Sequence, residues 1–163
     1  MRTIAITLSL TLFAVAAVAQ QPPAQKLYTS AADVQAMMAK AKAERKDQPT
    51  IAQQLLGLAP YNVNLEYRAS VGPAAVHEKD AEMFYVVEGS GTMVTGGKLV
   101  NEKRNNAANL GGTGIEGGNV REIGKGDFIM VPENTAHWFS KINGVLVLMS
   151  FHGPHPVMGM AGH

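Results

Sequence analysis

The sequence predicts an all-β domain, an antiparallel sandwich or barrel, preceded by a single helix. From residue 51 onward, short runs rich in β-branched and aromatic residues alternate with Gly, Pro or Asn at close spacing. Parallel sheets need long helical crossovers between strands, so this pattern is typical of an antiparallel sandwich or barrel. The 163 residues are enough for one domain with a proper core and too few for two.

The N-terminal segment, residues 1–19, has the parts of a cleavable secretory signal peptide. A basic start and an apolar run are followed by the small-residue cleavage site Ala17-Val18-Ala19. A membrane anchor is the alternative, but the apolar run is short for a span. No twin arginine precedes the run, which favours the general export route. We expect a periplasmic or secreted protein with no membrane contact after cleavage.

The composition excludes several classes of partner and site. Removal of residues 1–19 takes away Arg2 and no acid, so 14 basic residues become 13, equal to the 13 acidic ones. A formally neutral chain argues against a nucleic-acid partner, which requires a basic face. The sequence has no cysteine, so disulfides and thiolate ligands are impossible. A metal would have to bind to histidine or oxygen ligands.

Residues 20–29 have the composition of a tether, and residues 30–46 are predicted to form the helix. Ser30 and Asp33 form a capping signal at the start. The alanine-rich run that follows places Val34, Met37, Met38 and Ala41 on one stripe. The methionine pair is expected to pack against the domain.

The predicted strands cover residues 51–58, 61–68, 74–77, 82–88, 91–95, 120–123, 127–131, 136–142 and 145–151. The run Tyr61–Arg68 alternates, with apolar residues at odd positions and polar residues at even ones. Its polar face either lines a pocket or faces solvent, and a solvated outer face is the commoner arrangement.

Two segments lack periodicity. Residues 96–119 form a polar insertion, which is either a mobile loop at the mouth of a site or simply tolerated. The stretch Gly112–Gly117 spells a dinucleotide fingerprint, but the required strand, helix and βαβ unit are missing. The tail, residues 153–163, carries histidine and methionine among Gly and Pro. It is expected to be disordered, with copper binding as the alternative.

Two stretches pair a β-rich run with potential metal ligands at its edge. They cover residues 77–89 and 126–137. If the two runs lie side by side in one barrel, His77, Glu82 and His137 meet at one point. Two imidazoles and a carboxylate would form a metal site with vacant positions.

These stretches resemble the paired motifs of the cupin superfamily. The second motif reads G, five residues, P, one residue, G, two residues, H. Gly126, Pro132 and His137 match it, with Asn134 in place of the middle glycine. Asparagine tolerates positive φ better than other non-glycine residues, so the turn can survive this change.

The first motif is degraded. It reads H-x-H, three or four residues, E, six residues, G. His77, Glu82 and Gly89 match the last three places, and Ala75 occupies the place of the first histidine. Alanine cannot bind a metal. The loss leaves three ligands, which are enough for a catalytic-type site.

The resemblance covers about residues 60–152 and implies a single jelly-roll β-barrel over residues 50–152, with the helix packed outside. It implies one divalent ion on His77, Glu82 and His137, with positions open to water, substrate or dioxygen. Iron, manganese, zinc, nickel and copper all accept such ligands. The resemblance also implies a homodimer.

Further site candidates rest on weaker signals. His152 lies near the end of the last strand and could serve as a replacement ligand or proton shuttle. Lys79, Tyr67 and Tyr85 are candidate acid–base partners, although structural roles are commoner for tyrosines.

Two functions therefore compete. The first is an exported metalloenzyme acting on a small polar organic molecule by dioxygenase, isomerase or lyase chemistry. The second is a non-catalytic barrel that binds a sugar or another small molecule, which the loss of a ligand at Ala75 favours. Metal handling by the tail is a third.

Overall fold

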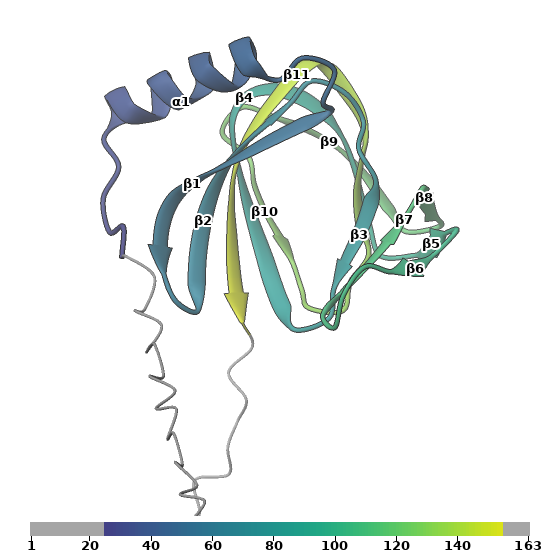
Figure 1. Ribbon diagram of the computed structural model, residues 1–163. Coiled ribbons are helices and arrows are strands. Elements are labelled where there is room, and N and C mark those ends of the chain that lie inside the picture. The colour runs from purple at the N-terminus through teal and green to yellow at the C-terminus, as the bar shows by residue number, and fades with distance from the viewer. Residues whose placement is uncertain (1–24, 155–163) are drawn as a thin grey trace, which may run out of the picture.

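The computed structural model describes residues 25–154. The predicted signal peptide, the tether up to residue 24 and the tail from residue 155 lie outside the described residues. Figure 1 shows one β-barrel with a single helix above it. No helix in this range is long and apolar enough to cross a membrane.

The elements follow the predicted order. They are α1 (Ala31–Glu44), β1 (Thr50–Leu58), β2 (Tyr61–Arg68), β3 (Ala74–His77), β4 (Asp80–Thr95), β5 (Lys98–Val100), β6 (Lys103–Arg104), β7 (Asn109–Gly112), β8 (Gly114–Glu116), β9 (Asn119–Gly124), β10 (Phe128–Val131) and β11 (His137–Pro154).

The two longest strands, β4 and β11, organise the barrel. Each replaces two predicted strands, because the glycines expected to end a strand bend it instead. Gly89 has a φ of 84° and Gly144 a φ of 78°, and the β4–β11 register shifts between Ile142 and Leu146. A bulge of this kind turns a strand without ending it.

The bend lets β4 and β11 belong to both walls of the barrel. The first half of β4 pairs with β10 and its second half pairs with β9. The second half of β11 pairs with β2, and His137 at its start pairs with Ala75 in β3. Both ends of these strands are therefore brought to the same end of the barrel.

Apolar side chains fill the interior, as period-two strands predict. The core consists of Phe84, Val86, Met93, Ile123, Ile129, Val131, Phe139, Leu146 and Leu148. Phe84 and Phe139 meet edge to face, with ring centroids 5.2 Å apart. This packed layer supports one wall of the functional site.

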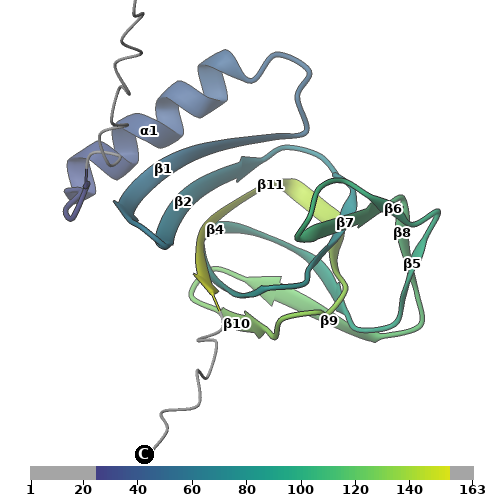
Figure 2. The same ribbon diagram turned by 60° about the horizontal axis from the view of Figure 1, so that its bottom comes forward.

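Helix α1 lies outside the barrel along β1 and β2 (Figure 2). The predicted capping box is confirmed, because the Asp33 amide donates to the Ser30 side chain and the Asp33 carboxylate accepts from the Ser30 amide. Met38 and Ala41 are buried, and Met38 packs with Leu65 and Val147. The predicted apolar stripe therefore covers the odd-numbered face of β2.

Because α1 covers the face of β2 that carries the odd-numbered residues, the even-numbered residues of β2 point into the barrel. The expectation that this polar face is solvated is wrong. Glu66 is 7% exposed, and both Glu66 and Arg68 line a cavity that opens to solvent. Alternation identified two faces correctly, but only the position of the helix decided which one faces inward.

The insertion over residues 96–119 contains four short strands that the sequence pattern did not reveal. β5 pairs with β8, while β6 and β7 extend the main sheet beyond β3. In Figure 1 this group projects from the side of the barrel next to β3. Strands of two to four residues are too short to produce visible periodicity.

Candidate metal centre

Glu82 is the centre of a polar cluster inside the barrel. It lies near the start of β4, on the same face as Phe84 and Val86, and it is 3% exposed. A carboxylate buried so deeply requires charged or hydrogen-bonding partners to offset its desolvation. The structure provides three imidazole rings.

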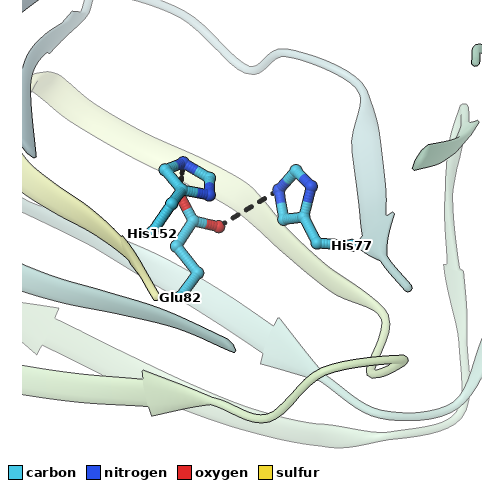
Figure 3. A group of neighbouring side chains, drawn as sticks. All are labelled: His77, Glu82 and His152. Carbon is cyan, nitrogen blue, oxygen red and sulfur yellow. Dashed lines mark ion pairs between the residues drawn. The ribbon is translucent and has the colours of Figure 1, made fainter. Parts of the chain in front are cut away.

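His77, His137 and His152 all turn their Nε2 atoms toward this carboxylate. Oε2 of Glu82 lies 3.3 Å from Nε2 of His77 and 3.1 Å from Nε2 of His137. Oε1 lies 3.1 Å from Nε2 of His152. Figure 3 shows His77 and His152 reaching Glu82 from opposite sides. Both predicted histidines therefore reach Glu82, and His152 does so as well. The set whose ligand atoms all lie close to one another is His77, Glu82 and His152, without His137.

The strand register explains why distant residues meet. His77 ends β3, while His137 begins β11 and pairs with Ala75. His152, near the other end of β11, stands opposite Glu82 itself. A histidine from β11 thus reaches the carboxylate, while Ala75, at the place of the missing motif histidine, still lines the same cavity.

The turn before β11 anchors the second motif to the first. Asn134 has a φ of 55°, as expected for a residue in the place of a glycine. Its amide donates to the carbonyl of His77 over 2.7 Å. This hydrogen bond connects the Pro132–Asn134 turn to the end of β3, where His77 is located.

Two rings are oriented by a second hydrogen bond. Nδ1 of His77 lies 2.6 Å from the side-chain oxygen of Asn109 in β7. Nδ1 of His137 lies 3.5 Å from the carbonyl of Thr135. Both acceptors require a proton on Nδ1, which leaves the Nε2 lone pair facing Glu82. This is how metal-binding imidazoles are usually oriented.

The cluster shifts the pKa of its members. Burial raises the pKa of Glu82, but contacts with His137, His152 and His77 outweigh it, and the pKa lies far below its usual value. Glu82 raises the pKa of His77 against the effect of burial, and Asn109 adds to the rise. Glu82 likewise raises the pKa of His152 against burial, with a further contribution from Glu66.

The donor set fits a divalent cation. Ligand atoms of His77, Glu82 and His152 all lie within 4.8 Å of one another. When the rings of His77 and His137 are neutral and carry their proton on Nδ1, the buried Oε2 of Glu82 has no hydrogen-bond donor among the described residues. A buried anionic oxygen without a donor is costly. A cation between the carboxylate and the imidazoles would satisfy it, so the residues present fit a metal.

A cavity of about 310 Å³ opens beside the cluster. Besides Glu82 and the three histidines, it is lined by Thr50, Glu66, Arg68, Pro73, Ala75, Trp138 and Phe139. A ligand in this cavity would therefore touch both the polar cluster and the inward face of β2. A volume near the lower end of ligand pockets suits a small molecule.

The weaker acid–base candidates lie elsewhere. Lys79 is exposed in the turn between β3 and β4. Tyr85 points to the outer face of the barrel, where its ring packs 4.6 Å from that of Phe128. Tyr67 packs against the cluster under α1. None of the three lines the cavity. The two tyrosines stand at outward-facing positions, because inward and outward positions alternate along each strand.

Sequence reasoning missed Asn109 entirely and gave Glu66 and Arg68 no role in the site. Asn109 belongs to the insertion and reaches His77 across 32 residues, with no motif to indicate it. Glu66 and Arg68 were visible only as the polar face of an alternating strand. The direction of His152 could not be fixed from the sequence, because bulges in β11 interrupt the alternation of its side chains.

Comparisons with known proteins agree with this architecture. The sequence model of the cupin family matches residues 41–157. Among curated proteins, none matches the sequence.

Three solved structures illustrate the similarity of fold. The Cnp3 cupin domain of Schizosaccharomyces pombe is 13% identical (TM-score 0.49), covering 67% of each chain. Streptomyces Pac13, solved with uridine, is 14% identical (TM-score 0.47), covering 66% of this chain and 72% of its own. An RmlC-like cupin from Shewanella frigidimarina NCIMB 400 is 14% identical (TM-score 0.44), covering 67% and 79%.

Proposed function

Since this chain belongs to the cupin family, we propose that it is an exported metal-binding protein whose divalent ion sits among His77, Glu82, His137 and His152. The observation that carries the proposal is the buried Glu82 oxygen, which faces imidazole nitrogens and has no hydrogen-bond donor. Nitrogen and carboxylate ligands suit iron, manganese, zinc, nickel and copper.

Each of these residues would have a distinct role in binding the ion. Glu82 supplies the negative charge, and the three rings supply neutral donors. Asn109 and Thr135 hold two of those rings with Nε2 turned inward. A bound divalent ion supplies Lewis acidity beside the cavity. The apolar wall around Phe84 and Phe139 limits water access on one side.

We further propose that the protein is an enzyme acting on a small polar organic molecule, by dioxygenase, isomerase or lyase chemistry. A cavity of about 310 Å³ that includes the ligand cluster supports a small substrate over a polymer. The mixture of polar and aromatic lining supports an oxygen-bearing molecule. A non-catalytic binding barrel is the competing outcome of the tests below.

Metal content is the direct test. Protein purified from the periplasm is expected to carry about one divalent ion per chain by elemental analysis. The variants Glu82→Gln, His77→Ala and His137→Ala are each expected to lose most of it. Lys79→Ala, an exposed change in the neighbouring turn, is the matched control and should retain the metal. A metal-free wild type, or a metal that survives Glu82→Gln, would overturn the proposal.

Export and pairing complete the proposal. The basic start, apolar run and cleavage site in residues 1–19 support export to the periplasm or medium. A homodimer through β10 is supported by Phe128 and Met130, which are 70% and 62% exposed on that strand. Among the described strands β10 pairs only with β4, so one edge of β10 is open.

A further inference from the structure

We propose that the cavity binds its small molecule through a carboxylate held by Arg68, on the wall beside the metal cluster. This inference rests on the proposed function, because it names the substrate class of the same site. It comes from the arrangement of Glu66, Arg68, Ser150 and Phe139, which the metal ligands do not require.

Arg68 is fixed in place from two directions. Its Nε and Nη2 atoms both donate to Oε2 of Glu66, at 2.8 and 2.5 Å. Its guanidinium carbon lies 4.5 Å above the centre of the Phe139 ring. A guanidinium held by a carboxylate and an aromatic face keeps one orientation, so little entropy is lost when it binds a ligand.

Glu66 is in turn held from behind. Its Oε1 accepts a hydrogen bond of 2.8 Å from the hydroxyl of Ser150, which is fully buried in β11. Both carboxylate oxygens of Glu66 therefore have a donor: Oε1 accepts from Ser150 and Oε2 accepts from Arg68. The pair behaves as a preassembled part of the wall, not as a mobile surface ion pair.

The guanidinium has donors left over. Among residues 25–154, the hydrogen bonds that Arg68 donates come from Nε and Nη2, and none comes from Nη1. Because Glu66 takes the Nε edge, the Nη1 end of the planar fork is free. That end can donate to a carboxylate, which is the group that matches the geometry of the fork.

The charge of the cavity favours the same ligand. Arg68 is the one arginine or lysine among the described residues that line it, and Glu66 and Glu82 are its two acids. With a divalent ion and neutral histidines, three positive charges face two negative ones. An anionic ligand would neutralise the remaining charge, whereas a neutral sugar would leave it uncompensated.

The size of the cavity limits the ligand. Its volume of about 310 Å³ holds roughly ten water-sized groups at about 30 Å³ each. A short-chain organic acid with a second oxygen function fits this space. The proposed substrate class is therefore a small hydroxy, oxo or dicarboxylic acid, with the carboxylate at Arg68 and the other oxygen toward the metal cluster.

The test is calorimetric binding of malonate and succinate, with malonamide and succinamide as uncharged analogues of the same shape. The protein is the purified full-length mature chain with its metal, at pH 8. We expect the acids to bind and the amides to bind at least tenfold more weakly. We expect Arg68→Met to weaken binding of the acids by about ten- to hundredfold, as charge-assisted hydrogen bonds predict.

A second pair of variants separates recognition from folding. Glu66→Gln removes a competing charge but keeps a partner for Ser150, so it should bind the acids more tightly than the wild type. The double variant Glu66→Gln/Arg68→Met leaves no unpaired carboxylate behind, and it should bind them as weakly as Arg68→Met. Arg104→Met, which breaks an arginine pair with Glu78 outside the cavity, is the matched control and should bind like the wild type.

Metal content, measured on every variant, distinguishes the two levels of the proposal. Metal retained in Arg68→Met together with weakened acid binding supports the inference. Metal retained with acid binding unchanged, or with amides bound as well as acids, overturns the inference and leaves the metal site standing. A wild type without metal overturns the proposed function and this inference together.

Discussion

At the scale of single residues, Glu82 determines how the site responds to pH. The rings of His77 and His152 have pKa values raised above the usual 6.5, mainly by Glu82. A protonated ring cannot bind a metal, so metal affinity must fall as pH drops through these raised values. We expect a loss of roughly ten- to hundredfold per pH unit below that point, measured by competition with a chelator from pH 8 to pH 5.

In the metal-free protein, the contribution of the histidines to folding stability should increase as the pH falls, whereas metal affinity decreases. Raised histidine pKa values contribute stability that is complete below 6.5 and is lost as pH rises through the folded values. The lowered pKa of Glu82 contributes stability that is present above 4.5 and is lost in stronger acid. The metal-free wild type should therefore exceed Glu82→Gln in folding stability by the largest margin between about pH 4.5 and 6.5. Equal melting curves for the two proteins across this range would contradict the ion cluster.

Asn109 offers a test of how the ring of His77 is held. Its side-chain oxygen accepts from Nδ1 of His77 over 2.6 Å. We expect Asn109→Ala to lower metal affinity by about ten- to hundredfold while the barrel stays folded, which is the usual effect of losing such a partner. Asn143→Ala, which removes an exposed bond to Ser90 on a different hairpin, is the control. A variant that binds metal like the wild type would show that Asn109 does not position the ring.

At the scale of elements, the β4–β11 pair depends on close approach at one glycine. A Cβ added to Gly89 would stand 1.9 Å from the carbonyl oxygen of Val145, and the φ of 84° is itself unfavourable for alanine. We expect Gly89→Ala to destabilise the fold by about 2 kcal/mol or more, measured by denaturant unfolding.

Gly124 at the end of β9 provides the comparison. A Cβ there meets nothing within 4 Å, and its φ is not in the left-handed region. Gly124→Ala should change the free energy of unfolding by no more than about 0.5 kcal/mol. If the two substitutions had equal effects, the bend at Gly89 would not be what allows β4 to serve both walls.

At the scale of the whole molecule, the open edge at β10 bears on assembly. Phe128 and Met130 are large apolar residues exposed on that strand, and Tyr85 packs beside Phe128. Light scattering of the mature protein should give the mass of a dimer, and Phe128→Glu should give a monomer, because a charge is costly in a buried interface. Val120→Glu, on exposed β9, should leave the dimer intact. A monomeric wild type would exclude this pairing.

The sequence alone determined the order of elements, the capped helix and the two motif stretches, because each depends on local periodicity or on spacing along one strand or turn. Strand direction also followed correctly for Glu82, Phe84 and Val86, since alternation is regular there. The resemblance of the two stretches to the cupin motifs, and not local periodicity, led to the prediction that His77, Glu82 and His137 share one end of a barrel.

Tertiary structure decided the rest. Whether the polar face of β2 looks inward depends on which face α1 covers, so Glu66 and Arg68 could not be placed beforehand. His152 meets Glu82 because of bulges in β11, and Asn109 meets His77 because β7 pairs with β3. Each of these contacts joins residues far apart in sequence, and the free energy that selects them belongs to the packed barrel and not to any one segment.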